Sequence, residues 1–335
     1  LAKFFIYKIK ATIFFHIFWY TINNMTEKTK LSTESYKGVR DFYPEDMAVQ
    51  NYIFDTWKKV CKENGFVEYG ASPLEPLELY KAKSGSEIVD EQTFTFKDRG
   101  DRDVALRPEM TPTLARLVAG KRKSLKFPLR WFSIPNLFRY ERPQKGRQRE
   151  HYQLNCDILG IAGIESEFEI IHLVHKIMLA FGAKATDFII KINDRKTLFE
   201  VYKDILKDQS EWGDVCRFLD KRDKLTPEEQ KEGNEKYFSR TLTKEEAEKK
   251  YENTELAKLI IELKNNGVNA ELDSGIMRGF DYYTGMVFEV YDNSEENRRE
   301  LLGGGRYDNL LEIFGVQPVQ TVGFGMGDII MRAFL

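Results

Sequence analysis

The residues best suited to chemistry lie in one stretch, FRYERPQKGRQREHYQLNCDILG, residues 138–160. Arg139 and Glu141 share one face of a predicted strand, and Gln153 and Asp157 share one face of the next. The loop between the two strands adds four cations, Arg142, Lys145, Arg147 and Arg149. Fixed cations bind phosphates, whereas a carboxylate and an amide bind a small polar ligand. The pattern predicts a ligand site on a hairpin; the alternative is a solvated hairpin with surface ion pairs.

Three shorter segments add candidates: LRPEMT at 106–111, RGFDYYTG at 278–285 and GGGRYD at 303–308. In the first, Glu109 and Thr111 place an anionic acceptor and a hydroxyl close together, as the binding of a cation requires. In the third, glycines let a ligand approach the backbone closely. Each segment alone is weak evidence, because a Pro-Glu pair often only caps a helix and tyrosines in a glycine-flanked turn can be structural.

Taken together, these segments resemble those of one enzyme family. The hairpin resembles motif 2 of class II aminoacyl-tRNA synthetases, in the form used by histidyl-tRNA synthetases. RGFDYYTG and GGGRYD resemble histidine-specific signatures of that family, and TVGFGMGD, residues 321–328, looks like its motif 3. The matches run from about Gly38 to Gly327. The resemblance implies activation of L-histidine by ATP to histidyl-adenylate, followed by transfer to tRNA(His).

The resemblance also implies roles for single residues in binding histidine. Arg139 and Arg278 are implied to be the catalytic cations around the α-phosphate, where negative charge develops during the reaction. Asp157 and Tyr283 are implied to pair with the two imidazole nitrogens. The whole implied histidine-binding set is Glu109, Met110, Thr111, Gln153, Asp157, Arg278, Tyr282, Tyr283 and Tyr307.

ATP and RNA are implied to meet the same hairpin. The implied ATP-binding residues are Arg139, Glu141, Arg147 and His151, with Arg147 at the γ-phosphate and His151 packed on the base. The implied tRNA-binding residues are Gln144, Lys145 and Arg149. Mg²⁺ is expected to bridge phosphates with few protein ligands, so we predict no metal-binding residue.

Motif 3 departs from the usual pattern of class II enzymes. The arginine expected three residues after Gly327 is replaced by Ile330. Arg332, two residues further, would point to a different face of the helix. The usual clamp on the ATP tail is therefore not expected from this helix.

The elements that must position these residues follow from periodicity. A helix is predicted from Pro44, with apolar positions at helical spacing and a stop at Gly65; these positions are Met47, Ile53, Trp57, Val60 and Cys61. In the second strand of the hairpin, Gln153, Asn155 and Asp157 alternate with Leu154, Cys156 and Ile158, which predicts one polar and one apolar face. Further along we predict strands at 127–141 and 151–160, a helix at 166–181, a strand-rich block at 271–291, a glycine-rich turn into a helix at 303–314, and a strand followed by a helix start at 321–335.

The predicted fold is α+β: a class II synthetase core in which a mixed, mainly antiparallel sheet is flanked by helices. We expect residues 1–24 to be a non-native or presequence extension, 25–194 the first part of the core, 195–265 a helical insertion and 266–335 the second part of the core. An anticodon-binding domain is expected to be absent. The resemblance implies a homodimer formed through the helix that begins at Pro44.

Composition sets outer limits on function. A formal charge of −2 predicts no global attraction to nucleic acid, so any RNA contact must come from local patches. Three widely spaced cysteines predict reduced thiols in an intracellular protein and neither a disulfide framework nor a metal site. The longest uncharged run near the start, Ala11 to Asn24, is short for a membrane span. We therefore expect a cytoplasmic protein, or an organellar one if residues 1–24 are a presequence.

Two other functions stay open. The histidine-sensing regulatory subunit of ATP phosphoribosyltransferase resembles the same core, but such proteins have generally lost parts of the catalytic set that this chain keeps. A synthetase-like module without catalysis is the other alternative, because of Ile330.

Overall fold

The computed structural model describes most of the chain. The described residues are 16, 19, 31–81, 92–142, 146–222, 225–252, 254–273, 275–276, 283–294 and 300–335. Contacts divide the chain into a unit of residues 1–36 and a unit of residues 37–335, and the second unit contains both sheets and both cavities.

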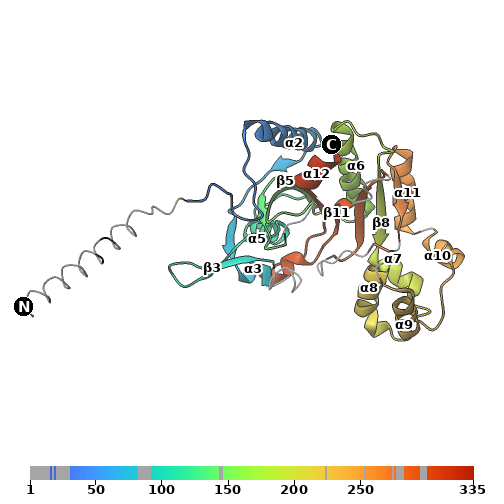
Figure 1. Cartoon of the computed structure of the whole chain (residues 1–335). Helices are drawn as coiled ribbons and strands as arrows, with labels where there is room; N and C mark the ends of the chain where they lie inside the picture. Colours follow the sequence, from blue (N-terminus) through green and yellow to red (C-terminus); the bar gives the residue numbers. More distant parts are fainter. Residues whose placement is uncertain are drawn as a thin grey trace, which may run out of the picture. The chain divides into compact units, whose positions relative to one another are not determined.

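A large mixed sheet forms the centre of this unit (Figure 1). Within the described residues it has nine strands, in the order β1-β5-β7-β12-β11-β10-β8-β9, with β6 paired to β7. All pairings are antiparallel except β1 with β5 and β8 with β9. The bounds are β1 Val67–Glu68, β5 Leu129–Ser133, β6 Asn136–Phe138, β7 Glu150–Leu159, β8 Phe188–Asp194, β9 Ala270–Leu272, β10 Met286–Asp292, β11 Glu300–Arg306 and β12 Thr321–Gly327. The predicted α+β class with a mainly antiparallel sheet is confirmed.

Helices cover the apolar face of the sheet. The principal ones are α2 (Pro44–Glu63), α6 (Ile164–Ala180) and the short α12 (Asp328–Phe334). In β7 the apolar residues Leu154, Cys156 and Ile158 belong to the main core, which they share with residues of α2 and α6. The opposite face of β7 carries the polar residues of the alternating pattern, and α5 (Thr111–Lys121) begins beside that face.

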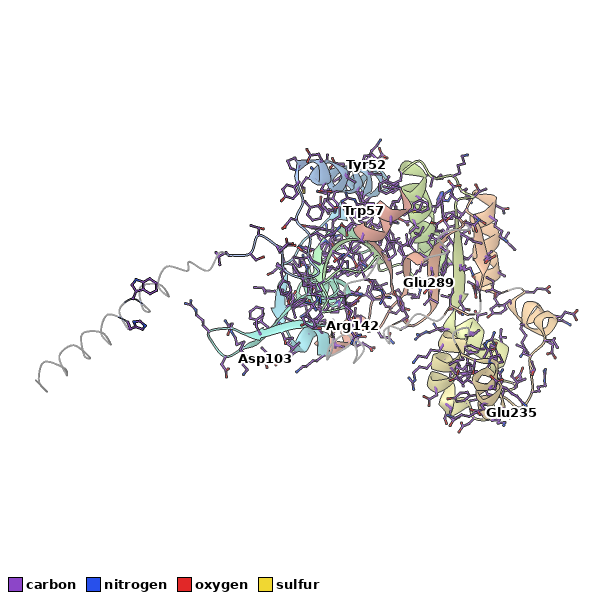
Figure 2. The ribbon with its side chains drawn as sticks, in the orientation of Figure 1. Tyr52, Trp57, Asp103, Arg142, Glu235 and Glu289 are labelled. Atoms are coloured by element: carbon purple, nitrogen blue, oxygen red, sulfur yellow. The ribbon has the colours of Figure 1, made fainter. Side chains whose placement is uncertain are left out.

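Helix α2 follows the sequence prediction with one difference. Pro44 occupies its first turn, and Asn64 and Gly65, which has a φ of 80°, end it. Trp57 is fully buried, but the predicted apolar position Met47 is 38 % exposed. Figure 2 labels Trp57 and Tyr52, the latter 51 % exposed on the outer side of the helix. Part of the apolar pattern of α2 therefore faces away from this core.

Two predicted elements were wrong in detail. The strand expected at 127–141 is split into β5 and β6, with Pro135 between them, because proline lacks the N–H that a continuing ladder needs. The glycine-rich turn expected from 303 is the strand β11, and the helix after it is the short 3₁₀ helix η3 (Leu310–Phe314). A Cβ on Gly304 would lie 2.3 Å from the carbonyl oxygen of Gly323, so glycine here allows two strands to pack closely.

Residues 195–265 are helical, as their periodicity predicts. They contain α7 (Arg195–Tyr202), the 3₁₀ helix η1 (Gln209–Glu211), α8 (Trp212–Lys221), α9 (Pro227–Tyr237), α10 (Lys244–Tyr251) and α11 (Glu255–Asn265). Side chains cap several of these helices: Asp194 accepts from the backbone N–H of Thr197, and Thr226 and Glu229 form a capping box. Helix α11 packs on α6, while α8 and α9 lie at the far end of this region (Figure 1).

A second, smaller sheet lies beside the start of α5. It has the order β2-β4-β3, with β2 at Leu74–Pro76, β3 at Phe94–Lys97 and β4 at Asp103–Leu106, and the short helix α3 (Glu78–Lys81) follows β2. The loop from β4 to α5 carries the predicted ammonium-binding residues.

The three cysteines are free thiols. Cys61 and Cys156 are buried with their sulfurs 3.5 Å apart, whereas Cys216 is only partly buried. Burial raises the pKa of the Cys156 thiol well above its ordinary value and that of Cys216 to about 11. Both are therefore poor nucleophiles at neutral pH. No helix in the described part of the chain is long and apolar enough to cross a membrane.

Candidate active site

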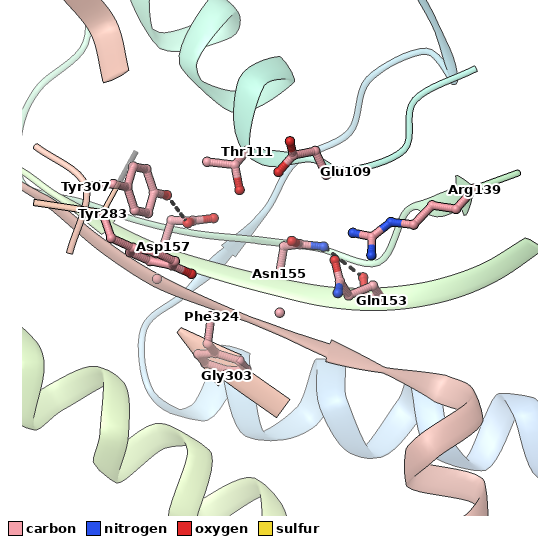
Figure 3. Close-up of a pocket in the computed structure, with 12 residues that line it drawn as sticks. Glu109, Thr111, Arg139, Gln153, Asn155, Asp157, Tyr283, Gly303, Tyr307 and Phe324 are labelled. Carbon is pink, nitrogen blue, oxygen red and sulfur yellow. Dashed lines mark hydrogen bonds between the residues drawn. The ribbon is translucent and has the colours of Figure 1, made fainter. Parts of the chain in front are cut away.

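A small cavity of about 120 Å³ opens on the polar face of the sheet (Figure 3). Its lining comes from the start of α5 and the loop before it, the residue after β6, the polar face of β7, the segment before β10, strand β11 with the residue after it, and strand β12. The lining residues are Glu109, Thr111, Arg139, Gln153, Asn155, Asp157, Tyr283, Gly303, Tyr307, Gly323, Phe324 and Gly325. Segments nearly 220 positions apart in the sequence therefore build one site.

Glycines in β12 leave room for the polar side chains of β7. Gly323 pairs with Asp157 and Gly325 pairs with Asn155 across the two strands. A Cβ on Gly323 would lie 2.1 Å from Oδ1 of Asp157, and one on Gly325 would lie 2.8 Å from the Gln153 amide. Any larger residue would displace these side chains, so the glycines of motif 3 form the floor of the site.

Asp157 is an acid of the cavity whose pKa is strongly shifted. It is buried, and Oδ1 accepts a hydrogen bond from the Tyr307 hydroxyl. Burial raises the pKa of Asp157 from 3.8 to about 7, and the bond from Tyr307 acts weakly in the opposite direction. The arrangement places a buried carboxyl group where its free oxygen can accept a hydrogen bond from an N–H group of a ligand.

The tyrosine beside Asp157 is fixed by the chain around it. The backbone N–H of Tyr307 donates to the Thr321 carbonyl at 2.8 Å. The next residue toward the N-terminus, Arg306, donates from Nη2 to Oε2 of buried Glu167 on α6 at 2.7 Å. This buried ion pair links the GGGRYD segment to α6 and holds Tyr307 over the sheet.

Glu109 and Thr111 face Asp157 from the loop before α5 (Figure 3). Arg107 shapes this loop: Nε donates to the Asn136 carbonyl at 3.0 Å and Nη1 to the Ala71 carbonyl at 2.8 Å. Arg139 donates from Nε to the Pro108 carbonyl at 2.9 Å, which aligns its guanidinium along the cavity. The cavity is thus lined by two separated buried carboxylates, Asp157 and Glu109, and by one cation, Arg139.

A second, larger cavity of about 650 Å³ lies along the hairpin. Its lining residues are Lys37, Gln92, Tyr140, Glu141, Arg142, Arg147 and Arg149. Nη1 of Arg147 lies 3.8 Å from Oε2 of Glu141, and the Arg149 guanidinium lies 4.0 Å from the centre of the Tyr140 ring. Four cations in one cavity suit a polyanion.

His151 lies in β7 between the hairpin loop and Gln153. Burial, and then the charges of Arg139 and Arg40, lower the pKa of His151 to about 3. The imidazole is therefore neutral at physiological pH. It does not line either cavity described above.

The structure gathers most of the predicted site residues. Around the first cavity lie Glu109, Thr111, Arg139, Gln153, Asp157, Tyr283 and Tyr307, and around the second lie Glu141, Arg147 and Arg149. Met110 is 1 % exposed and lies outside both linings, because it begins the packed first turn of α5. Arg278, Tyr282, Gln144 and Lys145 lie outside the described residues.

Sequence reasoning did not select five residues that line the first cavity: Asn155, Gly303, Gly323, Phe324 and Gly325. Asn155 shares the polar face of β7 with two selected residues, so the alternating pattern could have identified it. The glycines have no functional group, and only their pairing with β7 reveals their role.

Comparison with known proteins agrees with this geometry. A family model described as "Histidyl-tRNA synthetase" matches residues 38–327. A histidine–tRNA ligase of Leptospira biflexa is 42 % identical over 329 residues, which cover 92 % of this chain and 75 % of that protein. A chloroplastic/mitochondrial histidine–tRNA ligase of Arabidopsis thaliana is 38 % identical, covering 91 % of this chain and 66 % of that protein.

Among solved structures, an ATP phosphoribosyltransferase regulatory subunit/histidyl-tRNA synthetase of Bacillus halodurans has a TM-score of 0.73 at 25 % identity. That similarity covers 92 % of this chain and 84 % of the solved one. The family model spans well over half of the chain, and the curated relatives match most of its length. The chain belongs to the histidyl-tRNA synthetase family.

Proposed function

We propose that this chain is a histidine–tRNA ligase, which activates L-histidine with ATP and transfers it to tRNA(His). The observation that carries this proposal is the buried pair of Asp157 and Tyr307 in the same cavity as Glu109 and Thr111. Histidine has an imidazole at one end and an ammonium and a carboxylate at the other. A cavity with two separated buried carboxylates and one arginine is complementary to those groups.

In this proposal the imidazole donates an N–H to Asp157, and Tyr283 pairs with the other ring nitrogen. The ammonium group lies against Glu109 and Thr111, and Gln153 contacts the backbone of the amino acid. These positions are supported by the place of each side chain in the cavity lining. A ligand without the two ring nitrogens would leave buried polar groups unpaired, which is the physical basis of selection.

ATP is placed with its α-phosphate at Arg139 and its tail in the second cavity at Arg147. Glu141 and neutral His151 are assigned to the adenine side. The histidine carboxylate attacks the α-phosphorus and pyrophosphate leaves, so negative charge grows on oxygens that Arg139, and by resemblance Arg278, stabilise. ATP is expected to enter as its Mg²⁺ complex. Because Mg²⁺ is expected to bridge phosphates with few protein ligands, we assign no protein ligand to it.

Transfer follows when the terminal ribose of tRNA attacks the carbonyl carbon of the adenylate and AMP leaves. Gln144, Lys145 and Arg149 are proposed to meet the acceptor end. The support comes from Arg149, which lines the larger cavity and stacks on the exposed Tyr140 ring. A stacked arginine of this kind can contact both a phosphate and a base.

A homodimer is proposed through α2. Three apolar or aromatic residues of α2, Met47, Val49 and Tyr52, and Tyr43 just before the helix are each more than a third exposed. A second copy of this chain would bury that apolar surface. Sedimentation velocity of Tyr52→Glu against the parent chain tests this, and an unchanged dimer, or a parent that is already monomeric, would contradict it.

Cytoplasmic location is likewise a proposal. The Arabidopsis relative is named chloroplastic/mitochondrial. Cell fractionation with a tagged full chain would show whether this protein is in the cytoplasm or in an organelle.

Binding calorimetry tests the proposed substrate. L-histidine should bind, and each histidine methylated on one ring nitrogen should bind roughly 10- to 100-fold more weakly, because one buried partner is left unpaired. Phenylalanine should show no binding. Equal affinity for histidine and phenylalanine would contradict the assignment of Asp157 and Tyr283.

The regulatory-subunit alternative stays open because the similar Bacillus halodurans protein is described as an ATP phosphoribosyltransferase regulatory subunit/histidyl-tRNA synthetase. Such a protein would bind histidine in this cavity without activating it. Histidine binding alone therefore does not distinguish the two functions, whereas catalysis does.

A further inference from the structure

Helix α12 supplies no cation to either cavity. Ile330 packs against the main core, and Arg332 donates from Nη2 to Oδ1 of Asp46 on α2 at 2.8 Å. Neither residue lines the two cavities. The sequence expectation that Arg332 lies on a different face from the missing arginine is confirmed by this pairing.

The same helix instead begins with a buried acid. Asp328 is 0 % exposed, and both of its carboxylate oxygens accept hydrogen bonds. Oδ2 accepts from Arg40 Nη2 at 2.7 Å and from Gln50 Nε2 at 3.0 Å. Oδ1 accepts from the backbone N–H of Tyr152 at 3.0 Å. One carboxylate therefore joins the segment before α2, α2 itself and strand β7.

The residues joined in this way border the ATP side of the site. Tyr152 lies between His151 and Gln153 on β7. Arg40 follows the turn at Gly38, whose carbonyl accepts from the backbone N–H of Arg149 at 2.7 Å, and Lys37 lines the larger cavity. The segment that carries Arg40 thus runs along the hairpin on which ATP is placed.

The charge of Arg40 also reaches the site. It is one of the two cations that lower the pKa of His151, the other being Arg139. A buried carboxylate such as Asp328 is stable as an anion only when it is paired, and among its described contacts Arg40 is the cation. The pair is therefore mutually dependent: Asp328 holds the guanidinium in place, and the guanidinium offsets the cost of burying the Asp328 carboxylate.

We propose that Asp328 and Arg40 form a positioning pair for ATP, and that this pair organises the nucleotide side of the site in place of the missing arginine of motif 3. Asp328 fixes β7 at Tyr152, and Arg40 sets a cation beside His151. Neither residue is assigned direct contact with ATP. This inference rests on the proposed placement of ATP along the hairpin.

Steady-state pyrophosphate exchange with variants of the full chain tests the pair. Asp328→Asn keeps an oxygen for the Tyr152 N–H but loses the charge that holds Arg40. It should raise KM for ATP roughly 10- to 100-fold, the range expected for losing a hydrogen bond between charged groups. KM for histidine should change far less. Arg40→Gln should give the same selective loss, and Arg40→Lys should recover part of it.

Arg332→Gln is the matched control, because it breaks an Arg–Asp pair on the same helix outside the site and should leave both KM values unchanged. The double variant Asp328→Asn with Arg40→Gln should lose no more ATP affinity than Asp328→Asn alone. If Asp328→Asn does not fold, the comparison of Arg40→Gln with Arg40→Lys decides. Equal rises in KM for ATP and histidine, or no rise for ATP, would overturn the proposal.

Arg147→Ala separates this inference from the function on which it rests. If Arg147→Ala raises KM for ATP but the Asp328 and Arg40 variants do not, only the positioning pair is wrong. If Arg147→Ala also leaves KM for ATP unchanged, ATP is misplaced and the pair falls with it.

Discussion

At the scale of single residues, Asp157 is set apart by the difference between its folded and unfolded pKa values. The folded value is about 7 and the unfolded value is near 3.8. The folded protein therefore binds more protons than the unfolded chain between these pH values, and stability falls as pH rises through that window. Above about pH 7 the stability contributed by the protonated Asp157 side chain is fully lost. A ligand-binding acid thus weakens the unliganded fold at the pH where it must work.

Asp157→Asn should change both the pH dependence of stability and the affinity for histidine. The parent chain should lose stability relative to Asp157→Asn as pH rises from 4 to 7, by at most about 1.4 kcal/mol per pH unit. Asparagine cannot ionise, so the variant should lose this dependence of stability on pH. The same substitution should weaken histidine binding far more than ATP binding. Urea unfolding at several pH values and calorimetry with each ligand measure the two effects. Parallel stability curves for the two proteins would show that Asp157 is not perturbed.

Sequence alone selected seven of the residues that line the first cavity but not the contacts that hold them. Asp157 and Tyr307 could be selected because they lie in segments that resemble family signatures, and their roles stay predictions. The contact of Asp328 with Arg40 joins residues 288 positions apart, and that of Cys61 with Cys156 joins residues 95 apart. Local periodicity carries no information about such pairings, because it reports only which face of one element is apolar.

At the scale of elements, the paired strands β12 and β7 together shape the first cavity. The glycines of β12 were visible in the sequence, but their purpose depends on register: Gly323 lies opposite Asp157. The sequence also does not show which strands pair, and this explains the wrong prediction for β11. Its three glycines predict a turn from local propensity, but close packing between strands favours glycine in a sheet. The alternation in β7, by contrast, is a property of a single strand and was predicted correctly.

Gly323→Ala tests this packing. Its Cβ would overlap the Asp157 carboxylate, so histidine affinity should fall by at least about 10-fold while the protein stays folded. Gly327→Ala is the matched control on the same strand, because a Cβ there meets no atom within 4 Å. Fluorescence or calorimetric titration with histidine measures both. Equal affinities for the two variants would show that the floor of the site does not need glycine.

At the scale of the whole molecule, electrostatics should divide the two steps of the reaction. The chain carries a formal charge of −2, so its attraction to RNA must come from the local cations of the hairpin. The first step takes place between small ligands held against partly buried charges, which salt screens less than exposed ones. The second step needs a polyanion at the exposed loop.

The kcat/KM for tRNA should therefore fall roughly 10-fold between 50 and 200 mM salt, while histidine activation changes little. Arg149→Ala should make the salt dependence shallower by about one phosphate contact. Lys231 is an exposed lysine on α9 in the helical region, and Lys231→Ala should leave the salt dependence unchanged. Aminoacylation and exchange are measured in parallel. If Lys231→Ala flattens the salt dependence and Arg149→Ala does not, the RNA is gripped by the helical region instead.

Histidine-dependent exchange of pyrophosphate into ATP tests most directly whether the cavity is catalytic. The chain should catalyse exchange with L-histidine and with no other standard amino acid, and Arg278→Ala should reduce the rate by about 10²–10³ while leaving the protein folded. A folded chain that binds histidine in calorimetry but gives no exchange would contradict catalysis and would identify a histidine sensor instead.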